Sequence, residues 1–227
     1  MLEYFTRQIQ LWGKETQLSL QDKKVLVVGA GGLGSSMGYA LGSSGVGEIH
    51  LVDFDTITRH NIHRQIAFTL DDVGKNKAEI NAKRIKARCE FVKVVAHKCY
   101  FSEFTKADLS FDLIIDATDN LEVRREIDEY ARAKGTPWIH GTVEAFHGMV
   151  AFFEHSSYRD LFRLSSHAPN GVTAPMVMHI ASLEATLALR YLAGFEVKKD
   201  LLYYLYFNAE GELISQKFNL ANKKEQK

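Results

Sequence analysis

The sequence is poor in cysteine and has no net charge. Each of these features argues against a class of protein. Only two cysteines, Cys89 and Cys99, occur in 227 residues, and no C-x-x-C pair is present. We therefore expect neither a disulfide framework nor zinc. Lysine plus arginine and aspartate plus glutamate each number 28, so the formal charge is zero. Bulk electrostatics give no reason to expect nucleic acid or an anionic membrane as a partner.

The chain also lacks a long uninterrupted hydrophobic run. Its most apolar stretch, Val177 to Leu192, is broken by His179, Glu184 and Arg190. Met1 to Ile9 carries charged residues and does not resemble a secretory leader. These patterns predict a cytoplasmic protein without a membrane-spanning segment.

The length and composition fit one α/β domain with a continuous core, since 46% of the residues are hydrophobic and 25% are charged. We predict a single domain over residues 1–227. Within it, residues 1–22 form a helical arm, 155–173 a polar crossover loop and 221–227 a flexible tail.

Hydrophobic patterning predicts strands alternating with helices, which is typical of a Rossmann-like, doubly wound, mainly parallel sheet. The predicted strands are Val25–Val28, Glu48–Phe54, Phe91–Tyr100, Leu113–Ala117, Pro137–Val143 and Gly148–Glu154. The predicted helices are Leu11–Leu20, Leu33–Ser44, Asn76–Arg88, Leu121–Lys134 and Ala174–Ala193. Leu201–Asn208 and Glu212–Leu220 alternate around a turn, which predicts an antiparallel hairpin that extends the sheet.

A glycine-rich turn directly follows the first apolar strand and has the pattern G-x-G-x-x-G. Its glycines are Gly29, Gly31, Gly32 and Gly34. Such a turn brings backbone N–H groups and the positive end of a helix dipole to a phosphate. The second strand ends near Asp53, the usual place for a carboxylate that accepts ribose hydroxyls. We therefore predict a nucleotide site.

A dense group of polar residues lies between the second strand and the next helix. Its members are Asp53, Asp55, Asn61, Arg64, Gln65 and Lys77. An NAD-dependent oxidoreductase would use Asp53 but has no general need for Arg64 and Lys77. Attack on the α-phosphate of ATP builds negative charge on the phosphate oxygens and the departing pyrophosphate, which such cations stabilise. Both functions stay open, and the cations favour nucleotidyl transfer.

Asp119 follows another buried strand, and we interpret it as a ligand of Mg²⁺. The alternative is that Asp119 or Asn120 caps the helix that begins near Leu121. Both roles are compatible, because one residue suffices for the cap.

Together these motifs resemble the ThiF/MoeB/HesA family, prokaryotic relatives of ubiquitin-activating enzymes. The resemblance extends from about Tyr4 to Gly194. It rests on the glycine turn, Asp53-Phe54-Asp55, Asn61-Ile62-His63-Arg64-Gln65, Val73-Gly74-Lys75-Asn76-Lys77 and Ala117-Thr118-Asp119-Asn120. It implies ATP-dependent adenylation of the C-terminal Gly-Gly carboxylate of a small ubiquitin-like sulfur carrier such as ThiS or MoaD. A separate sulfur donor protein would act afterwards.

The resemblance also implies a role for single residues. Asp53 would bind the ribose, Asn61, Arg64 and Lys77 the phosphates, and Asp119 the magnesium. Arg7 matches an arginine that, in the family, reaches the nucleotide of the neighbouring subunit of a homodimer. Without the resemblance, a surface ion pair is the favoured interpretation of Arg7.

Two departures from the family pattern limit the expected chemistry. The zinc-binding C-x-x-C pairs of many members are absent, and the first would fall near residues 157–160. Where some members have a reactive cysteine, this chain has Ser165, Ser166 and His167. Because none of these replaces a thiolate, we expect adenylation without persulfide chemistry. A member that binds nucleotide or carrier without turnover remains an alternative.

Overall fold

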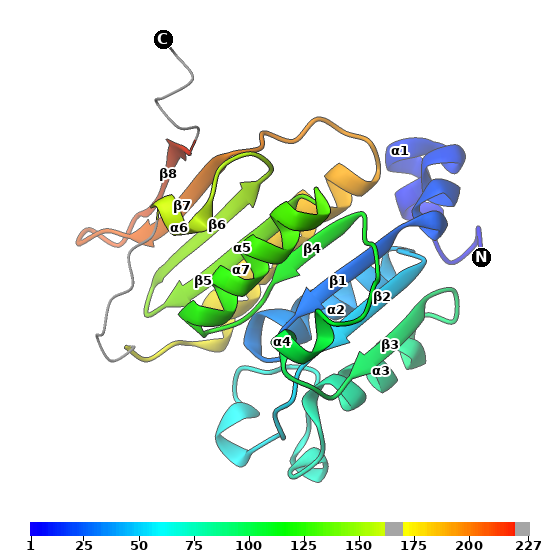
Figure 1. The fold of residues 1–227 in the computed structure, drawn as a ribbon, viewed down its shortest axis with the longest axis horizontal. Helices are drawn as coiled ribbons and strands as arrows, with labels where there is room; N and C mark the ends of the chain where they lie inside the picture. The colour runs from blue at the N-terminus through cyan, green and yellow to red at the C-terminus, as the bar shows by residue number, and fades with distance from the viewer. Residues whose placement is uncertain (162–169, 221–227) are drawn as a thin grey trace.

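The apolar runs lie side by side in one eight-stranded sheet with the order β3-β2-β1-β4-β5-β6-β7-β8 (Figure 1). The computed structural model describes residues 1–161 and 170–220. Ser165, Ser166, His167 and residues 221–227 lie outside the described residues. The strands are β1 (Lys24–Val28), β2 (Glu48–Val52), β3 (Lys93–His97), β4 (Leu113–Asp116), β5 (Trp138–Glu144), β6 (His147–Phe153), β7 (Leu201–Phe207) and β8 (Leu213–Asn219).

The pairing pattern is that of a doubly wound sheet with an antiparallel extension. β1 pairs in parallel with β2 and β4, β2 with β3, and β4 with β5. From β5 to β8 each pair is antiparallel. The predicted fold class and the predicted C-terminal hairpin are thus confirmed.

Helices cover both faces of the sheet, so the central strands are mostly apolar on both sides. On one face lie α2 (Gly32–Ser43), α3 (Lys77–Arg88) and α7 (Ala174–Leu192), and on the other α4 (Phe101–Phe104), α5 (Leu121–Lys134) and α6 (Tyr158–Leu161). Because successive side chains of a strand point to opposite faces, Val25 and Val27 join the first core, and Leu26 and Val28 the second. None of the helices in the described ranges is long and apolar enough to span a membrane.

The N-terminal helix α1 (Thr6–Ser19) begins five residues before the predicted start at Leu11. It contains a kink at Gly13, where φ is 85°, and the short 3₁₀ helix η1 (Leu20–Asp22) follows. Phe5 and Leu20, at its two ends, are buried in the core. Apolar contacts at its two ends therefore hold this segment against the sheet. The sequence signal lies in these end residues and not in a regular spacing of apolar residues along the helix.

Some other boundaries differ from the prediction. β2 ends at Val52 instead of Phe54, and β3 spans only Lys93–His97. The polar stretch after β2 contains two short 3₁₀ helices, η2 (Arg59–Asn61) and η3 (Leu70–Asp72), each begun by a threonine capping box. Local side-chain caps of this kind begin short helical turns that leave no mark in the apolar pattern.

One core position is occupied by an acid. Glu184 of α7 is fully buried, and neither carboxyl oxygen has a hydrogen-bond partner within the described chain. Its carboxyl group lies over Gly141 of β5, where an added Cβ would come within 2.2 Å of Glu184 Cδ. Burial raises the pKa of Glu184 well above its ordinary value, and the negative charge of Asp116 raises it further. Glu184 is therefore uncharged in the folded protein.

We expect Glu184→Gln to stabilise the protein increasingly as pH rises. Unfolding releases the Glu184 proton above the ordinary pKa of 4.5, so the wild-type free energy of unfolding falls with pH up to the folded pKa. The loss is at most about 1.4 kcal/mol per pH unit from this group. Urea unfolding of both proteins between pH 5 and 9 measures the difference.

Glu122→Gln is the matched control, because Glu122 lies on α5 with 67% of its side chain exposed. It makes the same chemical replacement at an exposed position and should leave the pH dependence unaltered. An equal pH slope in wild type and Glu184→Gln would show that Glu184 is ionised in the fold.

Candidate nucleotide site

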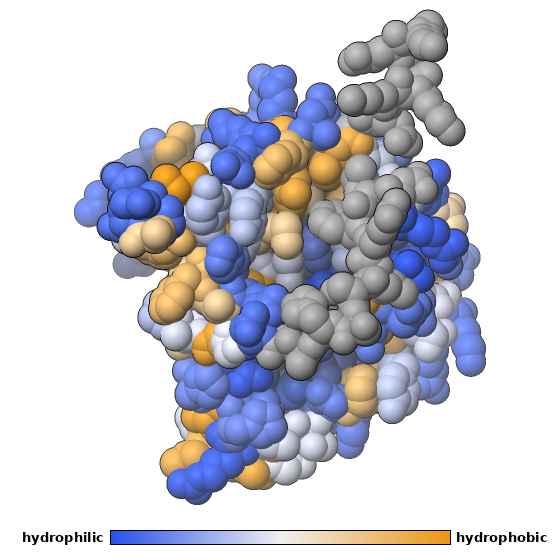
Figure 2. All heavy atoms as spheres, turned by 90° about the vertical axis from the view of Figure 1, so that its left-hand side faces the viewer, coloured by the Kyte–Doolittle hydropathy of each residue, from blue (hydrophilic) through white to orange (hydrophobic). Residues whose placement is uncertain are grey.

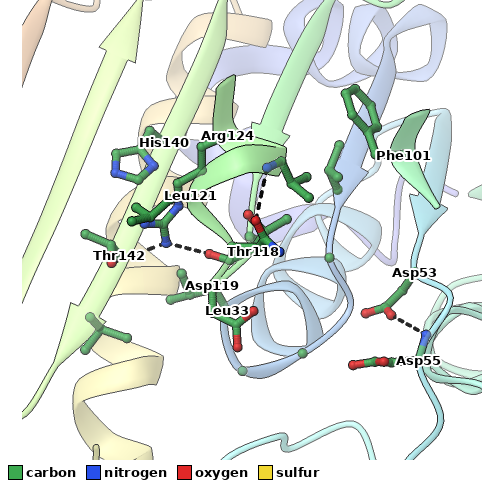
Figure 3. A pocket seen from close by; sticks show the side chains of 18 of the residues that line it. Leu33, Asp53, Asp55, Phe101, Thr118, Asp119, Leu121, Arg124, His140 and Thr142 are labelled. Carbon is green, nitrogen blue, oxygen red and sulfur yellow. Dashed lines mark hydrogen bonds between the residues drawn. The ribbon is translucent and has the colours of Figure 1, made fainter. Parts of the chain in front are cut away.

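The carboxyl ends of β1, β2 and β4 border a cavity of about 690 Å³ (Figure 3). Because parallel strands end at one edge, the residues after each strand meet there. Nine of the predicted site residues line the cavity, namely Gly29, Gly31, Gly32, Asp53, Asp55, Arg64, Gln65, Lys77 and Asp119. Asn61, Gly34 and Arg7 are not among the lining residues.

The glycine turn places β1, α2 and β4 in close contact. Gly29 has a φ of 95°, and an added Cβ there would lie 2.6 Å from the carbonyl oxygen of Ala117. A Cβ on Gly34 would lie 2.0 Å from the carbonyl oxygen of Gly29, so Gly34 packs behind the turn instead of lining the cavity. The first N–H groups of α2 have no partner within the helix and face the cavity edge, which suits an anion.

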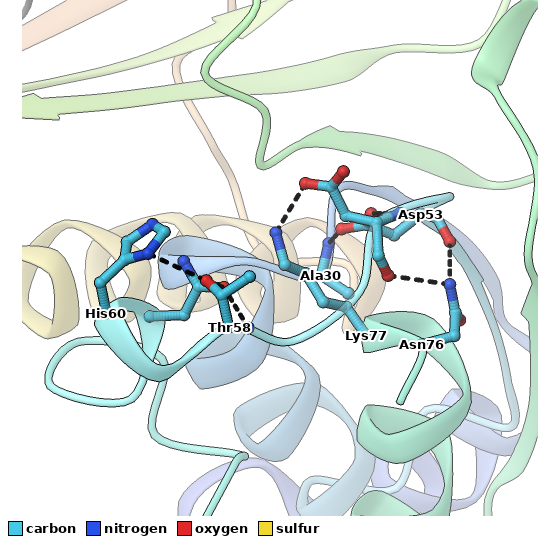
Figure 4. A network of polar contacts seen from close by, with 8 residues as sticks. Ala30, Asp53, Thr58, His60, Asn76 and Lys77 are labelled. Carbon is cyan, nitrogen blue, oxygen red and sulfur yellow. Dashed lines mark hydrogen bonds and ion pairs between the residues drawn. The ribbon is translucent and has the colours of Figure 1, made fainter. Parts of the chain in front are cut away.

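Asp53 is held in a fixed orientation beside the turn (Figure 4). Its Oδ2 accepts a hydrogen bond of 2.8 Å from the backbone N–H of Ala30, and its Oδ1 accepts one of 2.8 Å from that of Asp55. Burial raises the pKa of Asp53, against the lowering effect of these two bonds. The remaining lone pairs of the carboxyl group are available to hydroxyl donors such as those of a ribose.

Lys77 is the first residue of α3 and lines the same cavity. Its Nζ lies 2.7 Å from Asp55 Oδ2, and only 9% of its side chain is exposed. Asn76 fixes this junction, because its Nδ2 donates to the carbonyl oxygens of Asp53 and Asp55. The end of β2 and the start of α3 therefore hold the ammonium group near the turn (Figure 4).

Arg64 and Gln65 come from the segment after η2. The Arg64 Nη1 donates to the carbonyl oxygen of His60 at 3.1 Å. Gln65 is buried, and its Oε1 has no hydrogen-bond partner among the described residues. A buried, unpaired carboxamide oxygen beside the glycine turn is typical of a site completed by a ligand.

Asp119 and Asn120 divide the two roles that the sequence left open. Asn120 caps α5, because its Oδ1 accepts hydrogen bonds from the backbone N–H groups of Glu122 and Val123. Asp119 is exposed, lines the cavity, and makes no hydrogen bond or ion pair with any described residue. Its carboxylate is therefore available to a cation or a ligand.

Two predicted site residues have other contacts. Asn61 is buried in η2, where its Oδ1 accepts hydrogen bonds from the backbone N–H and the hydroxyl of Thr58. The prediction that Asn61 reaches the phosphates gains no geometric support, because its carboxamide oxygen serves this capping box. Arg7 is exposed on α1, and its Nη1 donates to Gln10 Oε1 at 3.2 Å. A role for Arg7 would require a second subunit.

A second polar group, beyond Asp119, was not predicted, and Figure 3 shows three of its members, Thr118, Arg124 and His140. Asp116 at the end of β4 is fully buried, and its Oδ2 accepts a 2.7 Å hydrogen bond from His140 Nδ1 on β5. Arg124 of α5 is also buried, and its Nη2 donates to the Thr118 carbonyl oxygen at 2.7 Å. Of these residues, His140, Arg124 and Thr118 line the cavity.

The protonation states of this group follow from its surroundings. Burial alone would raise the pKa of Asp116, but the hydrogen bond from His140 and the charge of Arg124 hold it below its ordinary value. Burial lowers the pKa of His140 in spite of the bond to Asp116. Asp116 is therefore an anion, and His140 is a neutral donor through Nδ1.

An aromatic wall completes the cavity at the ends of β2 and β3. Phe54 and Tyr100 both line it, with ring centroids 4.0 Å apart and an interplanar angle of 26°. The side chains are 47% and 58% exposed. Because the inner faces of the rings contact each other, their exposed surface lies on the edges and outer faces.

The charged side chains around the cavity suit a polyphosphate better than a metal ion held by protein ligands alone. In residues 1–161 and 170–220, no group of three or more histidine, cysteine, aspartate or glutamate side chains could hold a metal ion. Lys77 and Arg64 supply positive charge beside the glycine turn. Asp119 is a single oxygen donor, which suits Mg²⁺ when phosphate oxygens and water complete its coordination.

Known proteins are similar to this chain in sequence and in fold. The chain matches the ThiF family over residues 5–227. It is 34% identical over 199 residues to the sulfur carrier protein adenylyltransferase of Thermus thermophilus, covering 80% of this chain and 73% of that protein. It is 33% identical over 208 residues to the molybdopterin-synthase adenylyltransferase of Escherichia coli, covering 86% and 83%.

Two further comparisons concern length and fold. The chain spans 50% of the probable adenylyltransferase/sulfurtransferase MoeZ of Mycobacterium tuberculosis, at 32% identity over 80% of this chain. The crystal structure of E. coli MccB with ATP has a TM-score of 0.84 and 21% identity, covering 97% of this chain and 72% of MccB. The family match and the identities to the Thermus and E. coli adenylyltransferases show that the chain belongs to the ThiF family and is an adenylyltransferase of the ThiF/MoeB type.

Proposed function

We propose that the protein uses ATP to adenylate the C-terminal carboxylate of a small ubiquitin-like sulfur carrier. The observation that carries the proposal is that Lys77, Arg64 and Asp119 line one cavity with the glycine turn. The names of the Thermus and E. coli relatives support a sulfur carrier as the partner. An oxidoreductase is no longer a competing proposal, because the family is one of adenylyltransferases.

The reaction needs no nucleophile from the protein. A C-terminal carboxylate, with an ordinary pKa of about 3.5, is ionised at neutral pH. Its oxygen attacks the α-phosphorus of ATP, the bond from that phosphorus to the bridging oxygen breaks, and pyrophosphate leaves with the bond electrons. The acyl-adenylate remains, and Lys77 and Arg64 stabilise the charge that develops on the phosphates.

Asp119 would hold Mg²⁺ together with phosphate oxygens. The ion would neutralise charge on the triphosphate when bound. The fit rests on the free carboxylate of Asp119 at the cavity and on the absence of a competing ion pair within the described chain.

The adenosine moiety would extend from the glycine turn toward β2 and β3. Asp53 would accept hydrogen bonds from the ribose hydroxyls. The base would then reach Phe54 and Tyr100, whose outer ring faces offer a stacking surface.

The carrier would dock on the sheet surface that continues from the cavity. Met149 lines the cavity and pairs in register with Tyr204 on β7, which pairs with Gln216 on β8. Cross-strand partners share a face, so this row runs from the cavity to the sheet edge. Figure 2 shows hydrophobic residues exposed among polar ones on this side of the molecule. Phe218, two residues after Gln216 on β8 and therefore on the same face, is 47% exposed.

Sulfur transfer would fall to a separate donor protein in the cytoplasm. Cys89 is buried. Burial and the charge of Glu103 raise the pKa of Cys99, so its thiol is protonated at neutral pH. Cys89 is therefore inaccessible to a partner, and Cys99 does not offer a thiolate for the later step.

We expect the wild type to exchange labelled pyrophosphate into ATP only with a carrier present, since exchange requires reversible adenylation. Lys77→Ala and Asp119→Ala should each lower the exchange rate about 100- to 1,000-fold, because each removes charge stabilisation from the transition state. Mass spectrometry should detect the carrier with one AMP added.

Lys75→Ala and Asp71→Ala are the matched controls, since both side chains are exposed and outside the cavity lining. Both should keep wild-type exchange. If the wild type binds ATP and carrier but exchanges no pyrophosphate with either ThiS-like or MoaD-like carriers, the protein is a binding member of the family without turnover.

We also propose that the protein is a homodimer in which Arg7 reaches the nucleotide of the partner subunit. Arg7→Ala should then be inactive alone, as should Lys77→Ala. Mixing the two after dissociation should restore about a quarter of the wild-type rate, because half of the dimers are mixed and each has one intact site. Exchange assays and light scattering measure activity and mass.

Arg59→Ala provides the control, because Arg59 is an exposed arginine outside the cavity lining. Mixing it with Lys77→Ala should add no activity beyond its own share. If mixed dimers form but the mixture with Arg7→Ala recovers no activity, Arg7 does not act at the nucleotide site of the partner subunit.

A further inference from the structure

Asp116 forms hydrogen bonds that hold the loop carrying Asp119. The Asp116 Oδ1 accepts hydrogen bonds from the Thr118 backbone N–H at 2.9 Å and from the Thr118 hydroxyl at 2.6 Å. Its Oδ2 accepts from His140 Nδ1 at 2.7 Å. One carboxylate thus joins β4, β5 and the loop, and it is fully buried.

Arg124 also forms a hydrogen bond with this loop. Its Nη2 donates to the Thr118 carbonyl oxygen at 2.7 Å, and its Nε lies 3.4 Å from Asp116 Oδ2. The Thr142 hydroxyl oxygen is 3.4 Å from the same Nη2. Thr118, next to Asp119, is therefore held by its N–H, its hydroxyl and its carbonyl oxygen at once.

Such a cluster has a cost that apolar packing would avoid. Buried ion pairs often contribute no more to stability than hydrophobic residues of similar volume. Yet Asp116 and His140 are 0% and 1% exposed, and Arg124 is 7% exposed. The polar contacts converge on one loop, which points to placement of that loop as their use.

We propose that Asp116, His140 and Arg124 form a positioning assembly that holds the loop of residues 117–120 so that Asp119 faces the triphosphate before ATP binds. Asp116 and Arg124 act on the loop through Thr118, and His140 acts through Asp116. The inference rests on the proposed function only in that Asp119 serves a metal–nucleotide complex. A single carboxylate ligand depends strongly on its orientation, because no second protein ligand corrects it.

Thr118→Val removes the hydroxyl bond to Asp116 with little change in shape, and Thr118→Ser keeps it. In pyrophosphate exchange, Thr118→Val should raise the Mg²⁺ concentration for half-maximal rate about tenfold, as outer-shell changes at metal sites do. The maximal rate at saturating Mg²⁺ should stay near that of wild type. Thr118→Ser should restore the wild-type Mg²⁺ dependence.

Two readouts are independent of turnover. Electron paramagnetic resonance should show weaker binding of Mn²⁺ to Thr118→Val in the presence of ATP without carrier, and normal binding to Thr118→Ser. Hydrogen exchange of residues 117–120 in the ligand-free protein should be faster in Thr118→Val. If the wild type lacks pyrophosphate exchange, the proposed function fails, and these two measurements still test the assembly.

His140→Asn and His140→Leu form a second pair, since only asparagine keeps a donor near Asp116. His140→Leu should show the same defects as Thr118→Val, and His140→Asn should show less. Lower melting temperatures with unchanged Mg²⁺ dependence, Mn²⁺ binding and loop exchange in Thr118→Val would overturn the proposal. The cluster would then serve stability alone.

Discussion

The close contact among Gly29, Gly34 and Ala117 is the constraint on which the site depends. It brings the end of β1, the start of α2 and the end of β4 to one place without intervening side chains. Parallel pairing of β1 with β2 and β4 then sets the neighbours of the turn. This pairing places Asp53 on one side of the turn and the loop of Asp119 on the other.

The cavity has two walls with different physical character. The wall from β2 and α3 is held by hydrogen bonds between backbone and side chains, such as those of Asn76, and it presents Lys77. The wall from β4, β5 and α5 is held by a buried ionic cluster around Asp116. Both walls orient charged groups in advance, which reduces the reorganisation needed when a highly charged ligand binds.

The sequence predicts the site residues that follow strand ends, because an apolar run such as Leu113–Ala117 marks where the next polar residues must lie. Arg124 and His140 were not predicted. Arg124 precedes the core residue Ile127 by three positions, so helical period placed it on the buried face, but Arg125 beside it obscured that signal. His140 depends on the pairing of β4 with β5, which no local pattern reveals.

The contact between Gly141 and Glu184 has a consequence for variation in this chain. A Cβ at position 141 would lie 2.2 Å from Glu184 Cδ of α7, well inside van der Waals contact. A larger residue at position 141 thus requires the buried Glu184 side chain to move or position 184 to carry a shorter residue. The two positions form a coupled pair, so their tolerated replacements are joint choices and cannot be deduced from single changes.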